Sequence, residues 1–324
     1  MKAAVGSIYG PPEVVQVRNI PEPITGEHDV LIKVHLATVN RTDCGFRSGK
    51  PAIVRLFSGL ARPKFTVLGT EFAGVIESIG GQVSRFAVGD RIFGYNEGGW
   101  GAHAEYLSIA EDGPLATIPS HLSFAQAVAS TEASHYALAS IRKTGVRNGD
   151  DVLVYGATGA IGSAAVQLLK VVGANVVAVC DTQHIELVKG LGADRVIDRL
   201  AEDFTKDEQR FDLVFDAVGK STFGKCKPLL KPRGIYATTD LGPWAQNPIL
   251  ALTTPLLRSK KAMLPIPQSF DRELAEYFRG LIDSGQFKPV IDRAYPLDEI
   301  VDAYRYVETG QKIGNVLLTI VDED

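Results

Sequence analysis

The sequence predicts an α/β protein in which a doubly wound parallel sheet, residues 123–268, is inserted into a β-rich domain formed by residues 1–122 and 269–324. Three observations lead to this prediction. A glycine-spaced turn joins a strand pattern to a helix pattern, strands and helices alternate around it, and short strand-like runs broken by Pro and Gly dominate the flanks. Alternating strands and helices form a parallel sheet covered by helices on both faces, so the central part differs in architecture from its flanks.

The turn lies in residues 151–170, DVLVYGATGAIGSAAVQLLK, with Gly156, Gly159 and Gly162 three apart. The first glycine permits a tight reversal, the second lets the backbone approach a pyrophosphate, and the third lets helix and strand pack closely. The helix that follows points its free N–H groups and its positive dipole end toward phosphates. The stretch therefore predicts a dinucleotide-binding turn. A purely structural strand–turn–helix is the alternative.

Other residues are expected to contact the dinucleotide because they occupy the turn or follow the carboxyl ends of strands, where open α/β sheets bind ligands. Asp181 ends the second strand, nineteen residues after Gly162, where an acidic side chain binds the adenosine ribose. The remaining candidates are Thr158, Ala160 and Ile161 in the turn, Ala217 and Val218 after a later strand, and Leu241 after the next.

Strand and helix patterns divide the rest of the chain. In the first part, the alternating runs are 30–34, 74–79 and 91–93, which suggest a small antiparallel barrel. Ser123 is expected to cap a helix, with Gln126 as its capping-box partner. The central part predicts strands at 152–155, 175–180, 194–197, 211–215, 233–238 and 261–265, with helices at 161–172, 183–191 and 221–230. A helix at 272–284 precedes the final strand-like run.

The composition limits the classes of partner. The chain of 324 residues is long enough for two domains, is 45% hydrophobic and 22% charged, and carries a net charge of −4. It has no lysine-rich run for nucleic acid and no apolar stretch near the roughly 20 residues of a membrane span. No export signal is recognisable, and Cys44, Cys180 and Cys226 are expected to be reduced thiols. We expect a cytoplasmic protein without nucleic-acid or membrane partners.

The arrangement of these motifs resembles the medium-chain dehydrogenase/reductase superfamily, and within it the zinc-free quinone oxidoreductase branch. The matching stretches, in chain order, are TVNRTDCGFRSG, LGTEFAGVIESIG, GGWGAHAEY, the glycine turn, LGADRVID, FDLVFDAVG and KIGNVLLTI. The resemblance implies a GroES-like barrel that binds the substrate, a Rossmann domain that binds the dinucleotide, and an active-site cleft between them. It also implies a homodimer through the sheet edge near 233–238 and 261–265.

The resemblance assigns roles to five further residues. Asn40 and Thr42 match the segment that faces the nicotinamide and are the candidate catalytic hydrogen-bond donors, although Asn40 could instead cap a turn and Thr42 could bond to backbone. Arg41 is expected either to bind the pyrophosphate or to pair with a surface acid. Ser134 lies where the family places a hydroxyl beside the nicotinamide, and Asn315 where the tail closes the cleft.

The departures from the family pattern concern zinc. Zinc-dependent members carry Cys at the position of Asn40, His at Thr70 and a third ligand near Ser130, so the resemblance predicts a metal-free site here. Asp43 and Glu71 match positions close to those ligands and are expected to pair with Arg41 or Arg47. His103, His121 and His135 are expected to be surface or packing residues.

The sequence favours NADH over NADPH, because a 2′-phosphate would approach Asp181 and no Arg or Lys stands in the same loop to offset the repulsion. The family default is NADPH, and His184 could help it when protonated. Without a Lewis acid, hydride transfer requires an activated electrophile, so we expect a reductase of quinones or α,β-unsaturated carbonyls. The alternatives are an alcohol or aldehyde dehydrogenase and a non-catalytic NAD(P)H-binding redox sensor.

Overall fold

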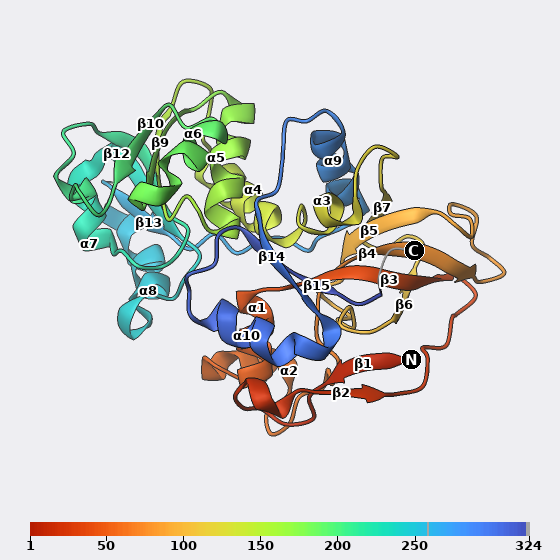
Figure 1. The fold of residues 1–324 in the computed structure, drawn as a ribbon. Helices are drawn as coiled ribbons and strands as arrows, with labels where there is room; N and C mark the ends of the chain where they lie inside the picture. Colours follow the sequence, from red (N-terminus) through yellow and green to blue (C-terminus); the bar gives the residue numbers. More distant parts are fainter. Residues whose placement is uncertain (258, 322–324) are drawn as a thin grey trace. The chain divides into compact units, whose positions relative to one another are not determined.

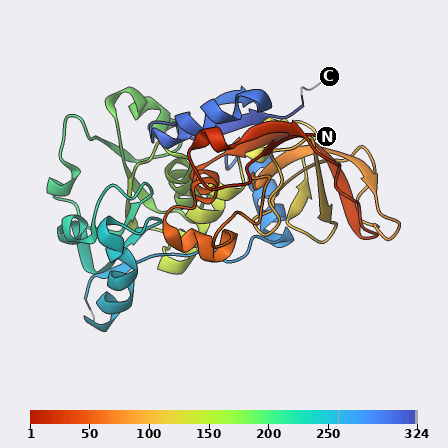
Figure 2. The same ribbon diagram turned by 90° about the horizontal axis from the view of Figure 1, so that it is seen from below.

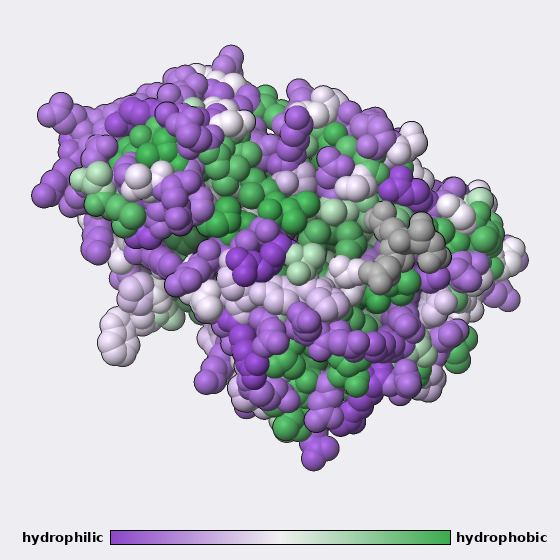
Figure 3. All heavy atoms as spheres, in the orientation of Figure 1, coloured by the Kyte–Doolittle hydropathy of each residue, from purple (hydrophilic) through white to green (hydrophobic). Residues whose placement is uncertain are grey.

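The computed structural model describes residues 1–257 and 259–321 and divides into two compact units. One unit comprises residues 1–132 and 269–324, and the other comprises residues 133–268. Within the described residues, no helix is both long enough and apolar enough to cross a membrane. On the face drawn in Figure 3, hydrophilic residues cover most of the surface, in keeping with the charged composition.

The second unit contains a six-stranded parallel sheet (Figure 1). Its strands are β8 (Asp151–Tyr155), β9 (Asn175–Cys180), β10 (Arg195–Asp198), β11 (Phe211–Asp216), β12 (Leu230–Thr238) and β13 (Lys261–Met263), in the order β10-β9-β8-β11-β12-β13. This is the doubly wound order, and it reverses direction between β8 and β11. The apolar runs of β8 and β9 are almost completely buried, because helices cover both sides of the sheet.

The helices of this unit follow from the same topology. They are α4 (Glu132–Thr144, beginning at the boundary), α5 (Ala160–Val172), α6 (Ile185–Gly190), α7 (Phe223–Cys226) and α8 (Gln246–Thr253). Parallel crossovers are right-handed, so strands added in opposite directions place their helices on opposite faces. Figures 1 and 2 show α5 and α6 on one side of the sheet and α7 and α8 on the other.

The first unit is built around a seven-stranded sheet. Its strands are β3 (Asp29–Val39), β4 (Glu71–Ile79), β5 (Arg91–Tyr95), β6 (Tyr106–Ala110), β7 (Leu115–Thr117), β14 (Ile291–Pro296) and β15 (Asn315–Thr319), and a separate hairpin pairs β1 (Lys2–Val5) with β2 (Gln16–Asn19). The helices are α1 (Arg41–Ser48), α2 (Arg55–Ser58), α3 (Phe124–Val128), α9 (Arg272–Asp283) and α10 (Ile300–Glu308). The strands from the first part of the chain pair antiparallel, as predicted, whereas β14 and β15 from the C-terminal part pair in parallel.

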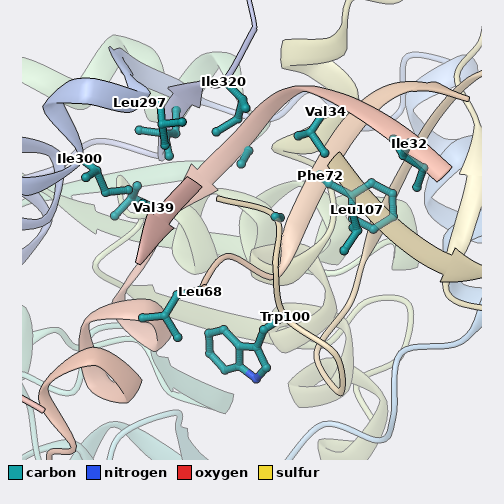
Figure 4. Close-up of a cluster of buried hydrophobic side chains, with 14 of the residues drawn as sticks. Ile32, Val34, Val39, Leu68, Phe72, Trp100, Leu107, Leu297, Ile300 and Ile320 are labelled. Carbon is teal, nitrogen blue, oxygen red and sulfur yellow. The ribbon is translucent and has the colours of Figure 1, made fainter. Parts of the chain in front are cut away.

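The core of this unit follows from strand alternation. Along β3, Val30, Ile32 and Val34 have no exposed surface, because side chains two apart point to the same face. Figure 4 shows Ile32 and Val34 with Phe72 of β4 in the same apolar cluster. The C-terminal segment completes the cluster with Ile300 of α10, so both ends of the chain share one core.

The division of the structure places residues 123–132 in the first unit, where α3 packs on β3, β4 and β5, whereas the sequence prediction begins the central domain at residue 123. The structure corrects one of the predicted helices. The predicted helix at 221–230 is the single turn α7 followed by a 3₁₀ turn at Lys227–Leu229, because β12 already begins at Leu230. The capping box of Ser123 and Gln126 forms as predicted at the start of α3.

Candidate active site

The glycine turn in the second unit has the shape that its three roles require. Gly156 has φ +82°, a left-handed conformation that favours glycine. A Cβ on Gly162 would lie 2.1 Å from the Gly156 carbonyl oxygen, so only glycine permits helix α5 to pack this closely. A Cβ on Gly159 would meet nothing nearer than 3.7 Å, so the space before this residue is open. Gly162 is thus required by the protein's own packing, whereas Gly159 leaves room for a ligand.

The N-terminus of α5 offers donors to such a ligand. Gly159 is the N-cap residue and, as a glycine, has no side chain with which to cap this end of the helix. The first N–H groups of an α-helix have no partner within the helix, so those of Ala160, Ile161 and Gly162 are directed outward with the positive end of the dipole. Thr158 lies half-buried in the turn before them. The residues present fit the pyrophosphate of a dinucleotide.

The loops after β11 and β12 begin at the same edge of the sheet as the glycine turn. Tyr155 at the end of β8 pairs with Asp216 at the end of β11, and the Ala217 N–H donates to the Tyr155 carbonyl at 3.1 Å. Val218 lies directly beside Gly156, where its methyl group would be 2.5 Å from an added Cβ. The structure therefore brings Ala217 and Val218 to the glycine turn, at the point where strand order reverses. Leu241 follows β12, one strand farther along.

The surroundings of Asp181 differ from the prediction. Arg199, which follows β10, pairs with Asp181, which follows β9, and its Nη2 donates to Oδ2 at 2.9 Å. The expected preference for NADH considered only the loop of Asp181, whereas the cation that pairs with this carboxylate comes from the end of the neighbouring strand. Neighbouring parallel strands end at the same edge, so residues far apart in the chain meet there. Arg199 also lines a hollow of about 380 Å³ with Tyr155 and Phe204, whose rings stack 4.7 Å apart.

In the first unit, Asn40 caps helix α1. Its Oδ1 accepts from the Asp43 N–H at 3.0 Å, and the Asp43 carboxylate accepts from the Asn40 N–H at 2.9 Å. This capping box realises the structural alternative for Asn40. The Nδ2 group of the same amide is directed elsewhere and donates to Oε2 of Glu132. Asn40 thus both orients the helix and binds a buried acid.

Glu132 connects the two candidate catalytic residues. Its Oε2 accepts from Asn40, and its Oε1 accepts from the Thr42 hydroxyl at 2.5 Å. The two donors were expected to face a substrate, and in the structure both bind one carboxyl group. Glu132 is 6% exposed, so this group is held out of bulk water.

Glu71 and Asp43 are not paired with arginines, contrary to the prediction. Glu71 accepts from the hydroxyls of Thr38 and Thr131 and from the Glu132 N–H at 2.7 Å. Asp43 accepts from the N–H of Gly69 at 3.2 Å in addition to that of Asn40. Arg47 pairs instead with Glu308.

We call Asp43, Glu71 and Glu132 the acid cluster. All three are buried, and desolvation raises the pKa of each carboxyl, to about 7 for Asp43. Repulsion from Glu71 and Asp43 further raises the pKa of Glu132. Desolvation lowers the pKa of Lys312, and the carboxylates of Glu132 and Glu71 act in the opposite direction. Lys312 donates to the Gly314 carbonyl at 2.5 Å.

Three further predicted residues lie in different settings. Arg41 is the first residue of α1 and is exposed. Ser134 is completely buried in α4. The Asn315 amide donates to the carbonyls of Val290 at 3.0 Å and Ala129 at 3.3 Å, so both of its hydrogens serve the backbone of its own unit.

The positions that correspond to zinc ligands carry other chemistry. Thr70 is buried, and Ser130 donates to the Ala127 carbonyl at 2.6 Å. In the described part of the chain, no three His, Cys, Asp or Glu side chains are grouped to hold a metal ion. The histidines occupy packing or surface positions: His103 donates to the Thr38 carbonyl, His135 bonds the Gln268 carbonyl, and His121 is exposed.

Sequence reasoning missed three residues of these sites: Glu132, Lys312 and Arg199. Lys312 begins KIGNVLLTI, a stretch that carries the family resemblance, and Glu132 lies two positions after Ser130. Arg199 follows the strand segment RVID at the same sheet edge as Asp181. The position of Arg199 after a strand was the available signal, because strand ends on one edge converge.

Comparisons with known proteins agree with this architecture. The family described as alcohol dehydrogenase GroES-like domain matches residues 26–120, and the zinc-binding dehydrogenase family matches residues 191–318. The 2-methylene-furan-3-one reductase of Solanum lycopersicum is 34% identical, over 98% of this chain and 79% of its own length. The chloroplastic NADPH-dependent alkenal/one oxidoreductase of Arabidopsis thaliana is 32% identical, with the same coverage.

A solved structure supports the same assignment. The quinone oxidoreductase from Coxiella burnetii superposes with a TM-score of 0.85 at 27% identity, over 99% of both chains. Together with the relatives above, which match nearly the whole chain, this likeness covers both units. The chain belongs to the medium-chain dehydrogenase/reductase superfamily, in its quinone-oxidoreductase-like branch, and is an oxidoreductase.

Proposed function

We propose that this protein is an NAD(P)H-dependent reductase of quinones or α,β-unsaturated carbonyl compounds. The observation that carries the proposal is the group formed by Asn40, Thr42 and Glu132, in which an amide and a hydroxyl bind a buried carboxyl. The family resemblance aligns Asn40 with a ligand of zinc-dependent members. The names of the tomato and Arabidopsis relatives support the substrate class, since both act on conjugated carbonyls by name.

The chemistry follows from what this group can and cannot supply. Amide, hydroxyl and carboxyl groups donate hydrogen bonds and protons, but they do not polarise a plain ketone as a Lewis acid does. The reaction therefore needs an acceptor that is already electron-poor. Bound NAD(P)H supplies a hydride. The part of the protein is to bind the acceptor oxygen and to stabilise the charge that develops there, to which one positioned donor contributes on the order of 3 kcal/mol.

The dinucleotide is held, in this proposal, by the second unit. Its pyrophosphate would accept hydrogen bonds from the N–H groups of Ala160, Ile161 and Gly162, in the space beside Gly159. The Arg41 side chain is proposed as a further pyrophosphate contact. Ala217, Val218 and Leu241 line the path toward the nicotinamide, where Ser134 and Asn315 remain proposed contacts.

We propose that Asp181 and Arg199 together determine which dinucleotide is preferred. Asp181 favours the ribose hydroxyls of NADH, whereas Arg199 attracts a 2′-phosphate and neutralises the carboxylate that would repel it. The preference for NADH inferred from Asp181 alone is therefore reduced, and we expect both dinucleotides to support turnover.

Zinc independence, a homodimeric assembly and a cytoplasmic location are parts of the same proposal. The first is supported by Asn40 and Ser130, whose side chains bind neighbouring protein groups at positions that correspond to zinc ligands. The dimer is expected through the free edge beside β13, which is the last strand of its sheet.

The deciding experiment follows NAD(P)H oxidation by the chelator-treated protein with a panel of quinones, enones and alkenals. A parallel assay measures reduction of NAD(P)⁺ by simple alcohols. Turnover of conjugated acceptors but not of alcohols is expected. Alcohol oxidation that requires added zinc would establish the dehydrogenase alternative, and tight dinucleotide binding without turnover of any acceptor would favour the redox sensor.

A further inference from the structure

The reaction proposed above needs a proton as well as a hydride, and the first unit contains a group suited to deliver it. We propose that the buried carboxyl of Glu132 is the proton donor, and that it acts through the hydroxyl of Thr42, which its Oε1 contacts at 2.5 Å. This inference rests on the proposed function, because it concerns the second half of the same reduction.

The charges around Glu132 favour its neutral form. Glu71 of β4, Asp43 of α1 and Glu97 after β5 repel its carboxylate, whereas the charge of Lys312, before β15, interacts with Glu132, Glu71 and Asp292. If all three acids of the cluster were ionised, three carboxylates would lie close together away from water. Close carboxylates in low dielectric cannot all remain charged, so the acid cluster retains a proton.

The hydrogen bonds decide which acid holds that proton. Glu71 accepts three hydrogen bonds, from two hydroxyls and one N–H, and Asp43 accepts two from backbone N–H groups. Several donors to a carboxylate stabilise its ionised form. Glu132 receives one amide N–H and shares one bond with a hydroxyl, which can reverse its direction. Glu132 is therefore the acid of the cluster that keeps its proton to the highest pH, above the pKa of about 7 of Asp43.

The contact between Glu132 and Thr42 provides a path for this proton. With Glu132 protonated, its O–H donates to the Thr42 Oγ, and the Thr42 proton is then free to point at an acceptor. Asn40 keeps the other oxygen of the carboxyl in place. The relay Glu132–Thr42 thus presents one proton where an isolated threonine hydroxyl, with its high pKa, would be a poor acid.

For an enone, bound NAD(P)H would supply the hydride: its C–H bond breaks, it is oxidised to NAD(P)⁺, and a C–H bond forms at the β-carbon of the acceptor. The electrons of the carbon–carbon double bond then form a double bond between the α-carbon and the carbonyl carbon, and the carbonyl π electrons move to the oxygen as an enolate. The Thr42 proton passes to that oxygen while the Glu132 proton passes to the Thr42 Oγ, which leaves an enol and a Glu132 carboxylate. Solvent reprotonates the carboxylate, and the enol tautomerises to the saturated ketone.

The first test needs no dinucleotide. Infrared difference spectra between the protein and its Glu132→Gln variant at pH 7 should show the carbonyl band of a protonated carboxyl group that the variant lacks. The matched control is Glu77→Gln, which removes an exposed glutamate of β4 and should leave that band unchanged. Absence of the band from the wild type at pH 7 would overturn the proposal.

The second test uses turnover. Glu132→Gln should lower kcat for an enone by at least about 100-fold, within the range general acids contribute, while the dinucleotide Kd measured by fluorescence stays within a few-fold. Thr42→Val should show a comparable loss, and Thr42→Ser, which keeps the hydroxyl, should retain most activity. Wild-type kcat in a folded Glu132→Gln variant would overturn the relay. Failure of the wild type on every acceptor would instead refute the proposed function, and the infrared result would stand separately.

Discussion

Arg199 donates a hydrogen bond of 2.9 Å to Asp181, and the two residues, 18 positions apart, share an ion pair where β9 and β10 end. The pair is partly exposed, so its own contribution to stability is small, typically about 0–1 kcal/mol. In the proposed dinucleotide site, the state of this pair would determine whether a carboxylate or a guanidinium faces the ribose. The two residues act in opposite directions on a 2′-phosphate.

We predict that Arg199→Gln shifts the ratio of kcat/KM for NADPH over NADH downward by about tenfold, which corresponds to about 1.4 kcal/mol. Asp181→Asn should shift the same ratio upward, since Arg199 is then released to bind phosphate. Steady-state kinetics with one quinone and both dinucleotides measure the ratio. Arg195→Gln, which removes an arginine of β10 that pairs with Asp207, is the control and should leave it unchanged. A ratio that moves in the same direction in both test variants would contradict this assignment.

The second and third glycines of the turn predict different outcomes for the same substitution. Gly159→Ala adds a methyl group that meets no protein atom within 3.7 Å, so Tm should stay near the wild-type value. The methyl group occupies the space proposed for the pyrophosphate, and the KM for NAD(P)H should rise by about tenfold or more. Gly162→Ala forces a Cβ to within 2.1 Å of the Gly156 oxygen and should destabilise the fold by about 1–3 kcal/mol.

Thermal unfolding and dinucleotide titration separate these effects. Gly190→Ala, at the end of α6, adds a methyl group with no atom within 4 Å and is the matched control for both measurements. Equal losses of Tm in the Gly159 and Gly162 variants would show that Gly159 has a packing role and no special relation to a ligand.

Much of the parallel sheet could be predicted from local sequence, because its strands are apolar runs bounded by turns. The predicted strand at 175–180 coincides with β9, and the helix predicted at 161–172 differs from α5 by one residue. The capping box of Ser123 was equally local. Short elements such as α7 were less predictable, since four residues carry almost no periodicity.

The candidate site could be predicted only in part, because its decisive contacts join distant segments. Asn40 and Thr42 were recognised from one motif, but Glu132 lies 92 and 90 positions away from them. No local pattern indicates that a glutamate at a helix start is buried against another carboxylate. The same limit applies to Arg199, which reaches Asp181 through the register of two strands.

The acid cluster predicts an unusual dependence of stability on pH. Burial raises the pKa of Asp43 from 3.8 to about 7, so between about pH 4 and 7 the folded protein binds more protons than the unfolded chain. Stability from this group therefore falls as pH rises through that window, by at most about 1.4 kcal/mol per pH unit. The Asp43→Asn variant loses hydrogen bonds at every pH, but it has no buried carboxyl group to ionise. Its free energy of unfolding should therefore be lower than that of the wild type at pH 5, and this difference should shrink between pH 5 and 8. Urea unfolding at several pH values measures the difference.

The control for this series is Asp112→Asn, which removes an exposed carboxyl group. The free energy of unfolding of this variant should stay within about 0.5 kcal/mol of the wild-type value at every pH, because surface substitutions usually change stability by no more than that. A deficit for Asp43→Asn that is constant from pH 5 to 8 would mean that Asp43 titrates normally in the folded protein.

His103 predicts the opposite slope in the same unit. Its ring is buried, its Nε2 donates to the Thr38 carbonyl at 2.8 Å, and desolvation lowers its pKa from 6.5 to about 4. Between these values the unfolded chain binds more protons, so stability falls as pH decreases from 6.5 to 4. His103→Gln should be less stable than wild type by about 1–3 kcal/mol at pH 8, and this deficit should narrow on acidification because glutamine does not titrate. The exposed His28→Gln variant should show neither effect, and a deficit for His103→Gln that widens below pH 6.5 would contradict a neutral, buried imidazole.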